Sequence, residues 1–119
     1  MNAPATPLLD QSLVEEIKQV ERATGKQGLF AGFVRKLEED VAAFGPAFAG
    51  AIAQGDGASA ARAAHKLKGA CRQLGVAALG DLFAEIERVA KAGDPAAGQR
   101  KFEGAADLIS QSLEALKRA

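Results

Sequence analysis

Apolar side chains recur every three or four residues along almost the whole chain, and no segment of useful length alternates with a period of two. This spacing is typical of amphipathic helices, whereas half-buried strands alternate. Five helices are predicted, over residues 10–23, 29–52, 58–74, 76–92 and 95–117. The expected fold class is therefore all-α. The last four helices, joined by short turns, would form an antiparallel up-down four-helix bundle, with the first as an additional N-terminal helix covering one end.

Local sequence marks the ends and the weak points of these helices. Ser12 and Glu15 fit a capping box at the start of the first helix, and Gly75 suits a left-handed helix end. Gly45-Pro46 interrupts the second helix without disturbing its apolar spacing, so we expect a kink there or two nearly collinear helices. The apolar stripes of the first two helices include Val20 and Phe33.

Length and composition restrict the class of protein. A chain of 119 residues fits one domain, expected over residues 9–119 and preceded by a flexible lead-in over residues 1–8 that contains two prolines. The net charge of zero gives no support to nucleic-acid binding, and no apolar run approaches the length of a membrane helix. The only cysteine, Cys71, fits a small buried hydrophobe and favours a reducing compartment, so a cytoplasmic location is expected.

The only histidine, His65, lies in a basic stretch of the third predicted helix. No acidic residue occurs between Asp56 and Asp81, and the stretch contains four cations: Arg62, Lys66, Lys68 and Arg72. A lone histidine on an amphipathic helix is usually a surface residue without a role. A nucleophile in a local positive field nevertheless suits a site that handles a negatively charged group.

The neighbours of His65 on the helix surface fit phosphoryl chemistry. Lys68, at i+3, could neutralise part of the charge of a phosphoryl group. Gly69, at i+4, costs about 1 kcal/mol relative to alanine in mid-helix, so either it leaves room for a partner or it packs closely against another helix. Arg72 and Lys66 could steer an anion from further away. A solvated face is the preferred reading of Lys66 and Arg62, and for Arg72 it remains an alternative.

The string A-H-K-L-K-G-x-x-x-x-L-G, from Ala64 to Gly75, resembles the signature of histidine-containing phosphotransfer (HPt) domains of two-component phosphorelays. The resemblance extends over residues 10–117. It implies that His65 is phosphorylated through Nε2, that Lys68 stabilises the phosphoryl group and that Gly69 provides clearance. Glu87 matches a position that can hydrogen-bond the other ring nitrogen, although an ordinary exposed glutamate is an alternative reading.

The resemblance also implies partners. Response-regulator receiver domains would exchange phosphoryl groups with His65, and a hybrid sensor histidine kinase would supply them. Docking would use an apolar patch near Ala58 and Ala61, with the basic residues at its rim. No cofactor is expected in this chain, since the Mg²⁺ needed for transfer belongs to the receiver. We expect a monomer without ATP-dependent kinase activity, without nucleic-acid binding and without membrane contact.

Two other functions fit the helical fold. The chain could be an adaptor that docks receiver domains without accepting phosphate, but an adaptor has no need of His65, Lys68 and Gly69 together. A hydrolase or metalloenzyme is disfavoured, because one histidine without a paired cysteine or clustered carboxylates is a poor metal or triad set. The sequence is compatible both with a free-standing protein and with a domain of a hybrid kinase.

Overall fold

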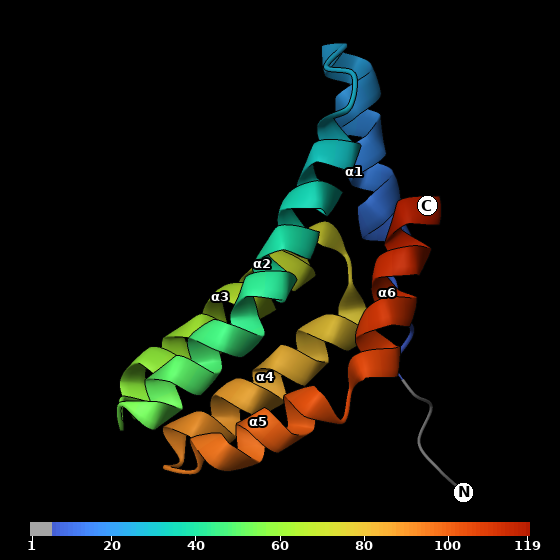
Figure 1. Cartoon of the computed structure of the whole chain (residues 1–119). Helices are drawn as coiled ribbons and strands as arrows, with labels where there is room; N and C mark the ends of the chain where they lie inside the picture. The colour runs from blue at the N-terminus through green and yellow to red at the C-terminus, as the bar shows by residue number, and fades with distance from the viewer. Residues whose placement is uncertain (1–5) are drawn as a thin grey trace, which may run out of the picture.

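The computed structural model describes residues 6–119, and every regular element in that range is a helix. The helices, shown in Figure 1, are α1 (Gln11–Thr24), α2 (Leu29–Ala53), α3 (Gly57–Leu74), α4 (Ala77–Lys91), α5 (Pro95–Glu103) and α6 (Ala106–Arg118). The predicted all-α class is confirmed. Residues 1–5 of the expected lead-in lie outside the described residues.

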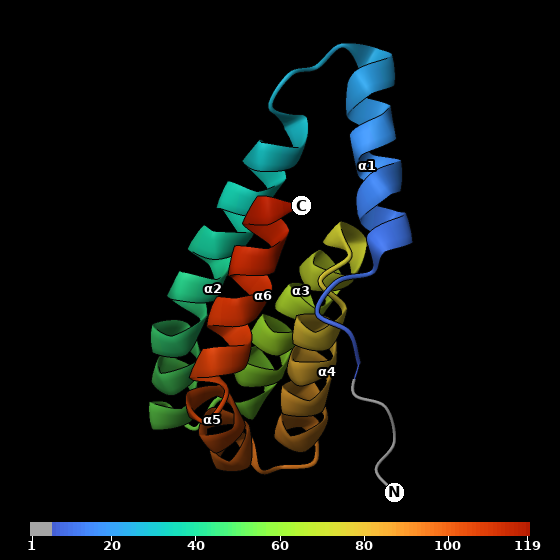
Figure 2. The same cartoon turned by 90° about the vertical axis from the view of Figure 1, so that its right-hand side faces the viewer.

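The bundle is built around the pair α3 and α4. α3 packs between α2 and α4, and α5 and α6 together occupy the fourth position, each in contact with both α2 and α4. α1 contacts α2 and α3 and extends beyond one end of the bundle (Figure 2). The arrangement matches the predicted four-helix bundle with an additional N-terminal helix.

The prediction of one continuous helix over residues 95–117 is wrong, because the chain bends between α5 and α6 (Figure 1). The amide of Ala105 donates to the carbonyl of Phe102, only three residues back, at 3.1 Å. Gly104, a poor helix former, ends α5 at this tight turn. The bend keeps Phe102 against Phe44 of α2, with ring centroids 4.9 Å apart, while α6 follows another direction.

α2 continues through Gly45-Pro46 as one helix of 25 residues. Proline there removes the hydrogen bond to the carbonyl four residues back, which is an energetic cost. The preceding glycine has a packing reason, since a Cβ at Gly45 would lie 3.2 Å from the ring of Phe102. The rings of Phe44, Phe48 and Phe83 lie in the same core. The interruption in the sequence is thus a place where α5 packs closely against α2.

Both ends of α3 are held firmly. Asp56 caps its N-terminus by accepting from the amide of Ser59 at 3.0 Å. Gly75 ends it with φ of 81°, as predicted, and its carbonyl accepts from the amide of Asp10 at 2.7 Å. Asp10 also caps α1, so the capping box predicted at Ser12 is wrong. α3 is therefore tied at its C-terminal end to the start of α1.

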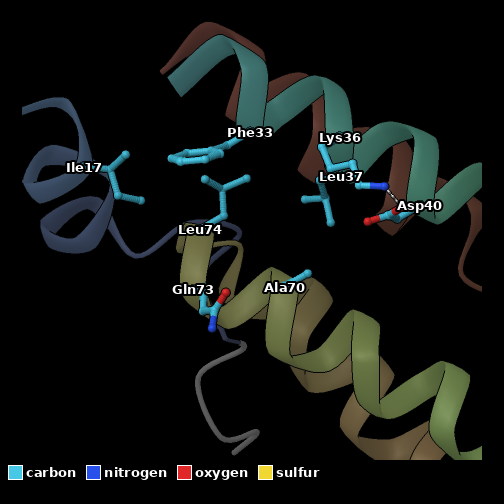
Figure 3. A pocket seen from close by; sticks show the side chains of 8 residues that line it. All are labelled: Ile17, Phe33, Lys36, Leu37, Asp40, Ala70, Gln73 and Leu74. Carbon is cyan, nitrogen blue, oxygen red and sulfur yellow. Dashed lines mark ion pairs between the residues drawn. The ribbon is translucent and has the colours of Figure 1, made fainter. Parts of the chain in front are cut away.

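Two residues of the predicted apolar stripes, Val20 and Phe33, are 53% and 46% exposed. α1 and α2 move apart away from the loop that joins them (Figure 2), and neither side chain is covered by another part of residues 6–119. Phe33 instead lines an open groove of about 250 Å³, together with Ile17 of α1 and Leu74 of α3 (Figure 3). α1 and α2 are amphipathic, but they lie too far apart to bury their apolar stripes fully.

Candidate functional site

Helix α3 has its core residues on one face and His65 on another. Its fully buried side chains include Ala60, Ala64 and Cys71, whereas the side chain of His65 is 65% exposed. Burial raises the pKa of the Cys71 thiol to about 12, which confirms the reading of Cys71 as a small buried hydrophobe. The helix thus presents its imidazole to solvent from a rigid, packed base.

Glu87 of α4 orients the imidazole of His65. Nδ1 of the ring lies 2.9 Å from Oε2 of Glu87, and the glutamate is only 4% exposed. The alternative reading of Glu87 as an ordinary exposed residue is therefore wrong. A carboxylate at Nδ1 favours the tautomer that carries its proton there, which leaves the lone pair on Nε2. Nε2 is the ring nitrogen that does not contact Glu87, and it belongs to a side chain that is 65% exposed.

Glu87 is the centre of a cluster of three partners. Its Oε1 lies 2.6 Å from Nζ of Lys68, and its Oε2 lies 2.8 Å from Nζ of Lys91. Burial raises the pKa of Glu87, but the hydrogen bonds from Lys68, Lys91 and His65 outweigh that effect and lower the pKa to about 2. Glu87 is therefore a carboxylate at any physiological pH.

The structure brings Lys68 to the site but gives it a partner that the sequence did not suggest. Its side chain is 22% exposed and bridges α3 to α4 through Glu87. Lys91 was not predicted at all. The spacing of Glu87 and Lys91, four residues apart on one helix, is the sequence feature that could have indicated it.

Gly69 faces open space next to the cluster. A Cβ at this position would meet no atom within 4 Å outside its own helical surroundings. Close packing against a neighbouring helix, the other explanation for this glycine, therefore does not apply. A bare backbone at i+4 from His65 leaves the approach to the ring unobstructed from that side.

Arg72 is not part of the Glu87 cluster. Its Nη2 lies 3.8 Å from Oδ1 of Asp81 on α4, with both side chains more than half exposed. Its stem lies over Gly80, where an added Cβ would approach Cγ of Arg72 to 3.1 Å. Asp81 also accepts from the hydroxyl of Thr6 at 2.7 Å. Arg72 thus has a structural contact of its own, about two helical turns along α3 from His65.

An open hollow of about 400 Å³ adjoins the imidazole on the α3–α4 face. Ala58 and Ala61, the small residues expected near the site, form part of its lining. The remaining lining residues are Arg62, His65, Glu87 and Lys91. The exposed surface of this lining is largely apolar although four of its six residues are polar or charged, and the cations Arg62 and Lys91 would suit a partner surface that carries an anion.

Residues 6–119 contain neither a membrane-spanning helix nor a cluster of metal-binding side chains. No helix in this range is both long and apolar enough to cross a membrane. The same residues contain no group of three or more histidine, cysteine, aspartate or glutamate side chains placed to hold a metal ion.

Comparison with known proteins identifies the class. The family model described as "Hpt domain" matches residues 28–119, so the chain belongs to the Hpt family. It is 34% identical over 114 residues to "Sensor histidine kinase AruS" of Pseudomonas aeruginosa, an alignment that covers 93% of this chain and 11% of that protein. No solved structure was found to match the chain. Membership of the family supports a phosphotransfer role in two-component systems.

Proposed function

We propose that this chain relays a phosphoryl group between receiver-domain aspartates through a phosphohistidine at His65. The observation that carries the proposal is the hydrogen bond between Nδ1 of His65, whose side chain is 65% exposed, and the buried carboxylate of Glu87. A histidine that only covers the surface needs no buried acceptor. The similarity to a sensor histidine kinase agrees with this proposal.

The proposed transfer follows from this geometry. The lone pair of Nε2 attacks the phosphorus of an aspartyl phosphate, and the bond from phosphorus to the carboxylate oxygen breaks, leaving its electron pair on the donor aspartate. The proton of Nδ1 stays in its hydrogen bond to Glu87. The ring gains positive charge as the N–P bond forms, and the carboxylate of Glu87 balances it. The reverse step passes the group to a second receiver.

Lys68 and Gly69 would assist this transfer in different ways. An ammonium group has three donors, so Lys68 can keep its contact with Glu87 and still donate to a phosphoryl oxygen. Gly69 would leave space for the incoming receiver. Arg72, tied to Asp81, would act only as a charge at the rim of the docking surface.

The partners follow from the same chemistry. A response-regulator receiver would supply the aspartate and hold the Mg²⁺, and a hybrid sensor kinase would be the upstream source. The chain itself would act as a monomeric carrier without ATP-dependent kinase activity. The hollow beside His65, with Ala58 and Ala61 in its lining, would contact the receiver.

The decisive experiment measures acid-labile label on the chain after mixing with receivers carrying radioactive phosphate. Wild type should take up label within seconds to minutes and pass it to a second receiver. His65→Gln should take up none while its helical circular dichroism is unchanged. Label that persists in His65→Gln would overturn the assignment of His65. Receiver binding without label on wild type would favour the adaptor instead.

A further inference from the structure

Lys91 shares an acceptor with the reactive histidine. Nζ of Lys91 and Nδ1 of His65 both lie within hydrogen-bond distance of the same oxygen, Oε2 of Glu87. The ammonium is therefore a close neighbour of the ring, although it comes from α4 rather than α3. Lys68 contacts the other oxygen, Oε1. The carboxylate thus holds one cation on each of its two oxygens.

The side chains of Lys68 and Lys91 differ in how much of each is exposed to solvent. The side chain of Lys68 is 22% exposed, whereas that of Lys91 is 65% exposed at the last residue of α4. Lys91 also lines the hollow beside His65, and Lys68 does not. A group bound at Nε2 that occupied this hollow would therefore meet Lys91. Lys91 can move because its long side chain is fixed only at Glu87.

Arg62, the other cation that lines the hollow, is less available to contact a phosphoryl group. Arg62 donates to the hydroxyl of Ser59 at 2.9 Å, and that hydroxyl donates in turn to Asp56 at 2.6 Å. Arg62 is therefore held towards the start of α3. Among the described residues that line the hollow, Lys91 is the cation held next to the imidazole.

We propose that Lys91 is a second phosphoryl-contacting residue, whose ammonium moves from Glu87 to the phosphoryl oxygens when the group binds Nε2 of His65. This inference rests on the function proposed above. A phosphoryl group brings up to about two negative charges, more than one lysine neutralises. Lys68 keeps its bond to Glu87, so the buried carboxylate does not lose both cations at once. In the alternative role, Lys91 would only pair with Glu87 within α4, and its loss would change stability rather than the rate of transfer.

The test uses phosphoramidate, a small donor whose P–N bond breaks with release of ammonia as Nε2 takes the phosphoryl group. A small donor removes docking from the measurement. Lys91→Ala should accept phosphate about tenfold more slowly than wild type, the loss expected for one charge-assisted hydrogen bond. Lys91→Arg should recover most of the rate. Lys101→Ala removes the same charge from a lysine paired with Glu85, and it should stay within about twofold of wild type.

Phosphorus NMR separates contact from mere structural support. The resonance of phosphorylated His65 should move in Lys91→Ala and stay in place in Lys101→Ala, because of these two lysines only Lys91 would touch the group. If wild type is phosphorylated, and Lys91→Ala has the same phosphorylation rate and the same phosphorus resonance, only the role of Lys91 is overturned. Wild type that takes no label on His65 from phosphoramidate or from receivers would overturn the proposed function and this inference together.

Discussion

Oε1 of Glu87 on α4 lies 2.6 Å from Nζ of Lys68 on α3, so an ion pair joins the two central helices next to the exposed imidazole. The same carboxylate orients His65 through its other oxygen. The carboxylate of Glu87 therefore both orients the imidazole and joins α3 to α4. Changes at Glu87 should affect both stability and transfer.

The ionisation of Glu87 should stabilise the fold. Its pKa in the folded chain, about 2, is below the ordinary value of 4.5. The stabilisation is therefore fully present above pH 4.5 and is lost as the pH falls from 4.5 towards 2. At pH 7, Glu87→Gln should lower the free energy of unfolding by about 1–3 kcal/mol, measured by urea denaturation.

The pH profile provides the check on this prediction. The difference in unfolding free energy between wild type and Glu87→Gln should shrink through the same pH window, because wild type becomes neutral there as well. The exposed Glu39 offers a matched control, since Glu39→Gln removes one carboxylate away from the cluster. Parallel profiles for wild type and Glu87→Gln would contradict the prediction.

Gly69→Ala should separate stability from transfer. Alanine fits the open space at this position and should stabilise α3 by up to about 1 kcal/mol, seen as a higher melting temperature. Transfer from a phosphorylated receiver should slow by about tenfold if the bare backbone serves docking. Gly50 also lies in a helix and also faces open space, so Gly50→Ala should raise stability without slowing transfer. Equal transfer rates in the two variants would assign Gly69 no role in docking.

Gly75→Ala should be more damaging than the same change at Gly25. Both glycines have positive φ, 81° and 69°, so each alanine suffers about 1–2 kcal/mol of backbone strain. At Gly75 the new Cβ would also lie 3.2 Å from the carbonyl oxygen of Asp10, whereas Gly25 has nothing within 4 Å. Urea denaturation should show the larger loss for Gly75→Ala. Equal losses of unfolding free energy in the two variants would show that α1 shifts away from the new Cβ at little cost.

Alanine substitutions of Phe33 and Phe48 should differ sharply in their effect on the free energy of unfolding, although both residues belong to the apolar stripe of α2. Phe48 is 1% exposed, so Phe48→Ala should cost about 3–5 kcal/mol of unfolding free energy. Phe33 is 46% exposed, and Phe33→Ala should cost less than about 1 kcal/mol. Thermal or urea unfolding of the two variants provides the comparison. A large loss from Phe33→Ala would mean that α1 covers the groove in solution.

Periodicity was sufficient to predict the helices but not their relative placement. The spacing of apolar residues located the bundle and its extra helix to within a few residues, because each helix buries one stripe. The same spacing continued across Gly104, where tertiary packing of Phe102 bends the chain between α5 and α6. It also could not show that α1 diverges and leaves Phe33 uncovered. Such features depend on the angle between helices, which periodicity does not contain.

The site was only partly predictable for a related reason. His65, Lys68 and Gly69 lie within five residues of one helix, so helical geometry alone places them together. Glu87 lies 22 residues from His65, and its burial and three partners depend on how α4 packs against α3. Lys91 follows from Glu87 and could be recognised only once Glu87 was known to belong to the site.

The sequence contains one cysteine, and its thiol lies fully buried in α3, the helix that presents His65 to solvent. A thiol reagent can reach Cys71 only when α3 separates from its neighbours, so its reaction rate counts openings of the fold at that helix. The wild-type chain thus contains a built-in reporter of local opening. If docking of a receiver or arrival of a phosphoryl group tightens the α3–α4 pair, the labelling of Cys71 will slow without any engineered probe.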